Sequence, residues 1–237
     1  LMSDGTIFAG VGEILNFGWT WDSMAEYAVK CTKKTLSASR IASMLSQACD
    51  DLYMQRPGDD TTVAVAHVME QKIISLFTGP PKDMDDDVKV MKAFMDGDGK
   101  KVVCGGTSAK IAARYLNRKI SNNNDGTAQV PPTSSIEGLD LVTEGVLTLN
   151  QAVKLLREYA KDEVDPEIFI ALDENNGAAR LADMIIENCT LLKLYVGTAE
   201  NSAQGNLVPE ISIRKNIVEQ LKEAAEALEK TVEITYY

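Results

Sequence analysis

The chain has 237 residues, of which 45% are hydrophobic and 25% are charged, and its net charge at pH 7 is −11. This composition is typical of a globular protein, and the length suits one large or two modest domains. The negative charge argues against a broad contact with a phosphate backbone, so we expect no nucleic-acid partner, and the lack of an apolar run of about 18 residues predicts no membrane span in this segment.

Two short acidic motifs stand near the front of the chain. Ser-Asp-Gly occupies residues 3–5, and Gly-Asp-Asp-Thr-Thr-Val occupies residues 58–63. Residues 61–68 are rich in Val and Ala, which predicts a buried strand. If the fold brings the two motifs side by side, Asp4 and Asp59 form an oxygen-only site suited to Mg²⁺ or Mn²⁺. Aspartate beside glycine also marks ordinary turns, so turns are the alternative interpretation.

Two helices are predicted between the motifs, after a loop or short strand over residues 6–21. Asp22 is the expected cap of a helix that runs to about Lys34, and Ser37 is the expected cap of the next helix. The second helix carries apolar residues at helical spacing, namely Ile41, Met44, Leu45, Ala48 and Leu52. His67, the only histidine, lies on the predicted strand; a structural role is favoured over one as a general acid.

Residues 1–68 resemble the C-terminal part of a metal-dependent protein Ser/Thr phosphatase domain of the PPM type, specifically that of sporulation stage II protein E. In that family a strand ends in Ser-Asp-Gly, two helices follow, and Gly-Asp-Asp-x-Thr-Val opens a final strand. Residues 2–5 and 58–63 match these motifs in order and in separation.

The resemblance implies a β-sandwich that holds two divalent cations, Mn²⁺ or Mg²⁺, and hydrolyses phosphoserine or phosphothreonine. Such cations lower the pKa of bound water and neutralise the phosphoryl oxygens. By resemblance, Asp4 and Asp59 are metal ligands. Gly5 and Asp60 are expected to lie beside these ligands and to support them without binding the metal directly. Asp60 could equally cap its own turn. The implied partner is a phosphorylated bacterial signalling protein.

The family pattern also needs acidic residues and an Asp-Gly motif from the N-terminal half of the domain. The later Asp-Gly pairs, at residues 96–97, 98–99 and 125–126, have polar, loop-like surroundings and are not recruited. We therefore expect this chain to be the C-terminal portion of a longer phosphatase, with an incomplete metal site and no activity as a fragment. No catalytic residue is assigned.

Residues 71–237 alternate between strand-like and helix-like segments, which predicts an α/β accessory domain with a parallel or mixed sheet covered on both faces. The predicted strands occupy residues 71–78, 101–104, 139–145 with a turn, 168–172, 191–196 and 231–237. The predicted helices occupy residues 88–94, 109–116, 148 onward with a Thr or Asn cap, 176–188 and 215–230. Residues 121–135 are expected to form a long polar loop.

Two turns of this second domain are candidate ligand contacts. Gly105, Gly106 and Thr107 join a strand to a helix, which leaves backbone N–H groups free for an anion. A close-packing turn is the alternative, because neither a dinucleotide-binding nor a Walker motif is present. Glu144 follows another strand, at the edge where open α/β sheets place their ligands. By resemblance, residues 103–107 and 141–149 belong to a C-terminal extension found behind clostridial-type phosphatase domains.

Two other functions stay open beside the phosphatase reading of residues 1–70. The chain could be a non-catalytic ligand-binding or scaffold module built on residues 71–237, with a small anionic ligand. An independent small-molecule enzyme lacks a nucleophile–base pair in the sequence. The four cysteines, none in a Cys-x-x-Cys pair, are expected to be buried free thiols of a cytoplasmic protein, namely Cys31, Cys49, Cys104 and Cys189.

Overall fold

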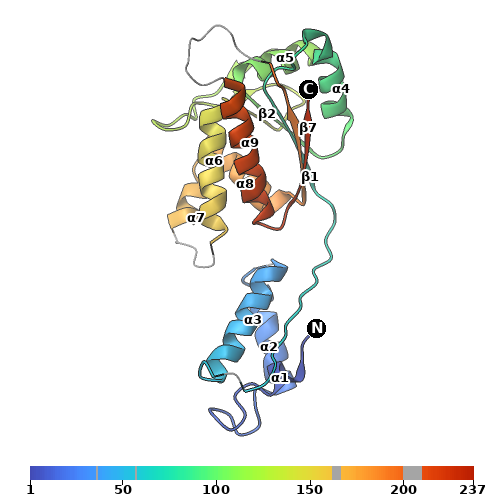
Figure 1. Cartoon of the computed structure of the whole chain (residues 1–237). Coiled ribbons are helices and arrows are strands. Elements are labelled where there is room, and N and C mark those ends of the chain that lie inside the picture. Colours follow the sequence, from blue (N-terminus) through green and yellow to red (C-terminus); the bar gives the residue numbers. More distant parts are fainter. Residues whose placement is uncertain (36, 57, 162–166, 200–209) are drawn as a thin grey trace. The chain divides into compact units, whose positions relative to one another are not determined.

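The computed structural model describes residues 1–35, 37–56, 58–161, 167–199 and 210–237. The chain divides into two compact units, Leu1–Glu70 and Gln71–Tyr237 (Figure 1). No helix in the described ranges is long and apolar enough to cross a membrane.

The described residues of the first unit form three helices, α1 (Asp4–Ile7), α2 (Trp21–Thr32) and α3 (Ala38–Leu52). The hydroxyl of Ser37 caps α3 by accepting a hydrogen bond from the amide of Arg40 at 3.2 Å, as predicted. The predicted cap of α2 is wrong. Thr20 occupies that position, and Asp22 lies in the first turn, where a carboxylate favours the helix dipole.

The apolar face of α3 packs against α2. Ile41 and Leu45 are buried in one cluster with Cys31 of α2. Tyr53, which follows α3, is buried in a second cluster with Cys49 and Ala9. The predicted spacing of apolar residues along α3 therefore corresponds to its buried face.

The predicted strand over residues 61–68 is wrong. This segment forms one isolated antiparallel bridge, between Met2 and Val63, and Val68 is 94% exposed. A strand needs a neighbour along its length, and within the described part of the unit only residues 1–3 pair with this segment through backbone hydrogen bonds. Residues 6–21, predicted as a loop or short strand, hold the end of α1, turns and one further isolated bridge. The described residues of this unit contain no β-sandwich.

The second unit has an α/β fold built on one mixed sheet. Five neighbouring strands are parallel, namely β5 (Leu141–Thr143), β2 (Lys100–Cys104), β1 (Ile73–Thr78), β6 (Leu191–Val196) and β7 (Thr231–Tyr236). The short strands β3 (Ser121–Asn122) and β4 (Ser134–Ser135) add antiparallel pairs beside β5. These two strands lie within the segment predicted as a long loop. The order β3-β4-β5-β2-β1-β6-β7 places β7 at an edge, as predicted.

Helices cover both faces of this sheet (Figure 1). On one face, α4 (Asp87–Asp96) and α5 (Gly106–Leu116) enclose a core that includes Phe77 and Phe94. On the other face, α6 (Val146–Tyr159), α8 (Gly177–Asn188) and α9 (Glu210–Glu226) enclose a larger core that includes Ile74 and Leu192. The strand runs are apolar on both sides because both faces are buried.

The segment predicted as a strand over residues 168–172 is a helix, α7 (Glu167–Leu172). Only Ile168 is buried; Phe169 and Ile170 are 51% and 72% exposed. The Phe169 ring makes an edge contact with Tyr159 of α6, at 6.2 Å between ring centroids. A short apolar run fits a strand or one helical turn equally well, so only its packing distinguishes them.

Three aspartates precede α4, at residues 85–87. Asp85 and Asp86 belong to a short 3-10 helix, Met84–Asp86, and Asp87 lies in the first turn of α4. Asp87 also forms an ion pair with Arg114 of α5. Carboxylates at these positions favour the positive end of the α4 helix dipole.

Candidate functional site

The two acidic motifs of the first unit lie side by side. The amide of Ser3 donates to the carbonyl oxygen of Thr62 at 3.0 Å, and the Ser3 hydroxyl accepts from the Thr62 amide at 2.8 Å. The same hydroxyl donates to the carbonyl oxygen of Asp60 at 2.9 Å. Ser3 thus joins the Ser-Asp-Gly motif to the Gly-Asp-Asp-Thr motif across 57 residues of chain.

Tyr53 lies beneath both motifs. Its hydroxyl donates to the carbonyl oxygen of Gly5 at 2.8 Å, and a Cβ atom on Gly58 would lie 2.4 Å from its ring. Burial, followed by the negative charges of Asp59, Cys49 and Asp4, raises the pKa of Tyr53. Both motif carboxylates are therefore close enough to act on one phenol.

Glycine is required where the motifs touch. A Cβ atom on Gly5 would lie 2.6 Å from the carbonyl oxygen of Asp60, which is too close for any side chain. Gly5 and Asp60, the two residues expected to support the ligands, are therefore in close contact, and their supporting role stays a prediction.

Asp4 and Asp59 are both exposed. One oxygen of Asp4 accepts from the Gly5 amide at 3.1 Å, and one oxygen of Asp59 accepts from the Asp60 amide at 2.8 Å. Each carboxylate keeps a second oxygen, which suits a hard cation. Within the described chain, no group of three or more acidic, histidine or cysteine side chains is arranged to hold a metal ion. Metal binding by the pair stays a prediction.

The two candidate turns of the second unit meet at one edge of the sheet. Gly105 is the N-cap of α5 and Gly145 is the N-cap of α6, and no side chain of the described residues caps either helix. The Gly105 amide donates to the carbonyl oxygen of Thr143 at 2.9 Å. A Cβ atom on Gly145 would lie 3.6 Å from the Cα atom of Gly105. Glu144, exposed, therefore borders the predicted Gly105–Thr107 turn, and the predicted Thr or Asn cap of α6 is wrong.

Sequence reasoning missed two buried hydroxyls at this edge. Ser108 and Thr148 each lie three residues after the N-cap glycine of their helix, and they are 1% and 0% exposed. Neither hydroxyl oxygen has a hydrogen-bond partner among the described residues. The equal spacing of Gly-x-x-Ser and Gly-x-x-Thr after neighbouring strands was the available signal.

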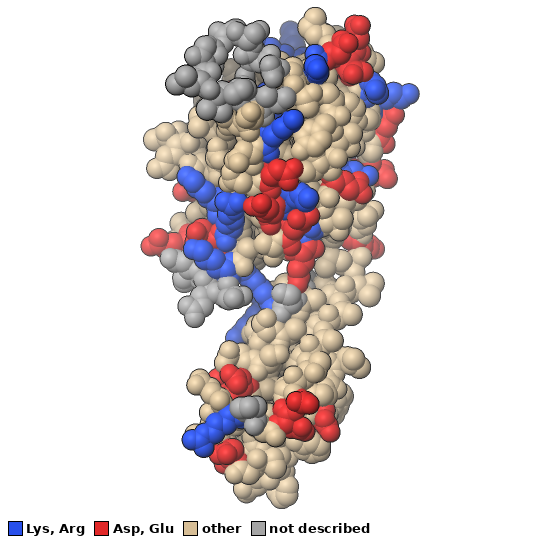
Figure 2. Space-filling view, viewed as in Figure 1, with Lys and Arg blue, Asp and Glu red and all other residues tan. Residues whose placement is uncertain are grey.

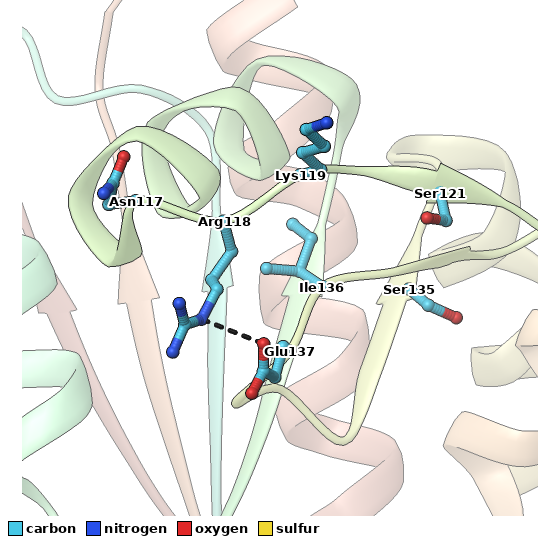
Figure 3. Close-up of a pocket in the computed structure, with 7 residues that line it drawn as sticks. All are labelled: Asn117, Arg118, Lys119, Ser121, Ser135, Ile136 and Glu137. Carbon is cyan, nitrogen blue, oxygen red and sulfur yellow. Dashed lines mark ion pairs between the residues drawn. The ribbon is translucent and has the colours of Figure 1, made fainter.

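A surface pocket of about 600 Å³ lies elsewhere on the second unit, where α5 ends (Figure 3). The Arg118 guanidinium points toward Glu137 and pairs with its carboxylate at 3.1 Å. Because this cation is already neutralised, the pocket gives no charged anchor for an anion at Arg118. It includes none of the predicted site residues.

Charge on the visible face of the second unit is intermixed (Figure 2). Arg157 of α6, for example, lies 3.3 Å from Glu223 of α9. Comparisons of the chain with protein-family models, with curated proteins and with solved structures found no match.

Proposed function

We propose that Leu1–Glu70 is the C-terminal part of a PPM-type protein Ser/Thr phosphatase domain, in which Asp4 and Asp59 provide carboxylate ligands for Mn²⁺ or Mg²⁺. The observation that carries the proposal is the junction at Ser3, which holds the two family motifs against each other through hydrogen bonds to Thr62 and Asp60.

The residues at this junction have separate tasks. Divalent cations, when bound, lower the pKa of a water molecule and neutralise the phosphoryl oxygens of the substrate. Asp4 and Asp59 would hold the cations through their carboxylates, each of which already accepts one hydrogen bond from a backbone amide. Tyr53 fixes the backbone at Gly5 and so fixes the direction of Asp4.

The β-sandwich of the phosphatase family belongs to this proposal. Large apolar side chains of the first unit are exposed over residues 1–21 and at the end of the unit, including Leu1, Phe8, Ile14, Phe17, Trp21 and Val68. Exposed apolar side chains gathered in one small unit favour a surface that packs against further protein. In the proposal, the remainder of the β-sandwich covers them.

The test uses the full-length protein that carries this chain. Hydrolysis of a phosphoserine peptide is expected to depend on Mn²⁺ and to fall at least about 100-fold in kcat/KM for Asp59→Asn, because metal contacts supply several kcal/mol of transition-state stabilisation. Asp50→Asn, which removes an exposed carboxylate from α3, is the matched control and should leave kcat/KM unchanged. Full activity in Asp59→Asn would exclude the assignment.

The second unit favours a separate, ligand-binding function. Its uncapped glycine edge at Gly105 and Gly145 is open to solvent in part, and Gly106 has no heavy atom within 4 Å of its Cβ position. Such an edge can tune a neighbouring domain by binding a small molecule. Under the phosphatase proposal the substrate is a phosphorylated signalling protein, and the second unit is the accessory domain.

A further inference from the structure

Open α/β sheets bind ligands where neighbouring strands send their following helices to opposite faces. This sheet has two such places at the carboxyl ends of its strands. At the first, β1 leads to α4 on one face and β6 leads to the face that α9 covers. At the second, β2 leads to α5 on one face and β5 leads to α6 on the other.

The place between β1 and β6 is filled by the chain itself. A Cβ atom on Gly197 would lie 2.1 Å from the carbonyl oxygen of Pro80, and one on Gly79 would lie 2.6 Å from the Arg214 guanidinium. Arg214 is buried and donates to the carbonyl oxygens of Gly197 at 2.9 Å and Ala199 at 3.3 Å. The described backbone and a committed cation therefore occupy the space immediately around Gly79 and Gly197.

The place between β2 and β5 is different, because two helices begin there without caps. The amides of residues 106–108 and 146–148 precede the first amide that bonds within each helix, and no acceptor for them is found among the described residues. Each helix N-terminus carries about half a positive charge. Two such ends meet across Gly105 and Gly145, so the edge is electropositive in an acidic protein.

Two buried hydroxyls mark the same edge independently. Ser108 Oγ lies 3.5 Å from the Cβ position of Gly105, which places it beside the open end of its own helix. Thr148 occupies the equivalent position of α6. Both hydroxyl oxygens lack a partner in the described chain, and buried hydroxyls without a partner are rare in native proteins. Their donors call for an oxygen acceptor from outside the described residues.

We propose that the twin-glycine edge, defined as Gly105, Gly106, Ser108, Gly145 and Thr148, binds the phosphate group of a small, hydroxyl-bearing phosphate monoester. A phosphate offers several acceptor oxygens to the amides of both helices and to the two hydroxyls. Glycine at both N-caps leaves the backbone accessible to it. Glu144, exposed beside Gly145, accepts hydrogen bonds from the hydroxyls of the ester and favours a sugar phosphate over a free anion. This inference does not depend on the phosphatase proposal.

The test is calorimetric titration of the intact chain with inorganic phosphate, ribose 5-phosphate and AMP. Gly106→Asp is the informative variant, because its carboxylate competes for the anion site while an acidic residue in the first turn keeps the helix stable. It is expected to weaken binding of the esters at least 10-fold. Val88→Asp adds the same charge to the first turn of α4, at a position 65% exposed, and should bind as the parent does.

Two further variants test the proposal, and three outcomes would overturn it. Ser108→Ala is expected to weaken ester binding while the ligand-free chain becomes no less stable. Glu144→Gln is expected to weaken binding of ribose 5-phosphate but not of inorganic phosphate. The assignment would be overturned if neither ester bound at millimolar concentration or if only inorganic phosphate bound. It would also be overturned if Gly106→Asp bound the esters as tightly as the parent chain does.

Discussion

The Tyr53 hydroxyl donates a hydrogen bond to the carbonyl oxygen of Gly5, which lies 2.8 Å away and 48 residues earlier in the chain. Through this bond the end of α3 holds the Ser-Asp-Gly motif, and through its ring Tyr53 supports the backbone at Gly58. The position of both acidic motifs therefore depends on one buried phenol.

Replacement of Tyr53 by Phe tests this dependence. The Gly5 carbonyl would lose its partner, and we expect the free energy of unfolding of the first unit to fall by about 1–3 kcal/mol. Both tryptophans of the chain, Trp19 and Trp21, lie in this unit, so denaturation can be followed by tryptophan fluorescence. Tyr27→Phe is the control, because no hydrogen bond of its hydroxyl is found in the described structure. Equal losses in both variants would contradict the prediction.

Substitution of Gly58 by Ala should also destabilise the first unit. The new methyl group would lie 2.4 Å from the Tyr53 ring, and overpacking of this kind costs about 1–3 kcal/mol. In the double variant with Tyr53→Ala the clash disappears, so the effect of Gly58→Ala should shrink toward zero. A double-mutant cycle measured by urea denaturation checks this, and additive effects would show that the ring is not the obstacle.

The second unit should lose stability at alkaline pH. Burial raises the pKa of Cys104 to about 12 from an ordinary value of 9.0, although a hydrogen bond from Thr143 opposes the rise. Between these pH values the folded thiol keeps a proton that the unfolded thiol has lost. The free energy of unfolding therefore falls as pH rises, by about 1.4 kcal/mol per pH unit from this group.

Cys104→Val removes that dependence and should give a shallower decline above pH 9. Urea denaturation followed by far-UV circular dichroism at pH 8, 9 and 10 measures the slope. A slope that is the same in the parent and the variant would show that the thiol does not control alkaline stability.

The loop that precedes β4 should depend on Asp125. Burial raises the pKa of this carboxyl, but hydrogen bonds from Thr133 and the charge of Arg180 outweigh burial and lower it overall. The carboxylate accepts from the Thr133 amide at 2.7 Å and from its hydroxyl at 2.5 Å. We expect Asp125→Asn to cost about 1.5–3 kcal/mol at pH 7, the range for hydrogen bonds to a charged group.

This contribution is present above pH 3.8, the ordinary pKa, and is lost as pH falls through the lower folded value. The difference in the free energy of unfolding between the parent and Asp125→Asn, measured by urea denaturation, should therefore become smaller in acid. Glu137→Gln, which breaks the exposed pair with Arg118 shown in Figure 3, should cost no more than about 1 kcal/mol. A larger loss of unfolding free energy for Glu137→Gln than for Asp125→Asn would contradict the prediction.

The burial of Ile168 and the exposure of Ile170 in α7 predict a large and a small loss of stability, respectively, when each is substituted. Ile170 is 72% exposed, and Ile170→Glu should change the free energy of unfolding by no more than about 0.5 kcal/mol. Ile168 is 6% exposed, and Ile168→Glu should cost several times more, because it buries a charge. Similar losses for the two variants would instead favour the buried strand that the sequence predicts here.

Local sequence signals were sufficient where an element depends on its own residues. The Ser37 cap and the apolar spacing after it define α3, and the apolar runs at residues 73–78 and 191–196 define two central strands. The α/β class of the second unit followed from the alternation of such runs. The side-by-side placement of the Ser-Asp-Gly and Gly-Asp-Asp-Thr motifs was posed as a condition on the fold, and the structure meets it at Ser3. Metal binding by Asp4 and Asp59 stays a prediction.

Long-range packing decided the rest. The apolar run of α7 has no periodicity long enough to separate helix from strand, and the Val-rich segment after Asp60 lacks a neighbouring strand along its length. Gly105 and Gly145 are 40 positions apart in the numbering, and they meet only because β2 and β5 are neighbours in the sheet. The chain encodes each glycine turn locally, but the site between two turns exists only once the strands have paired.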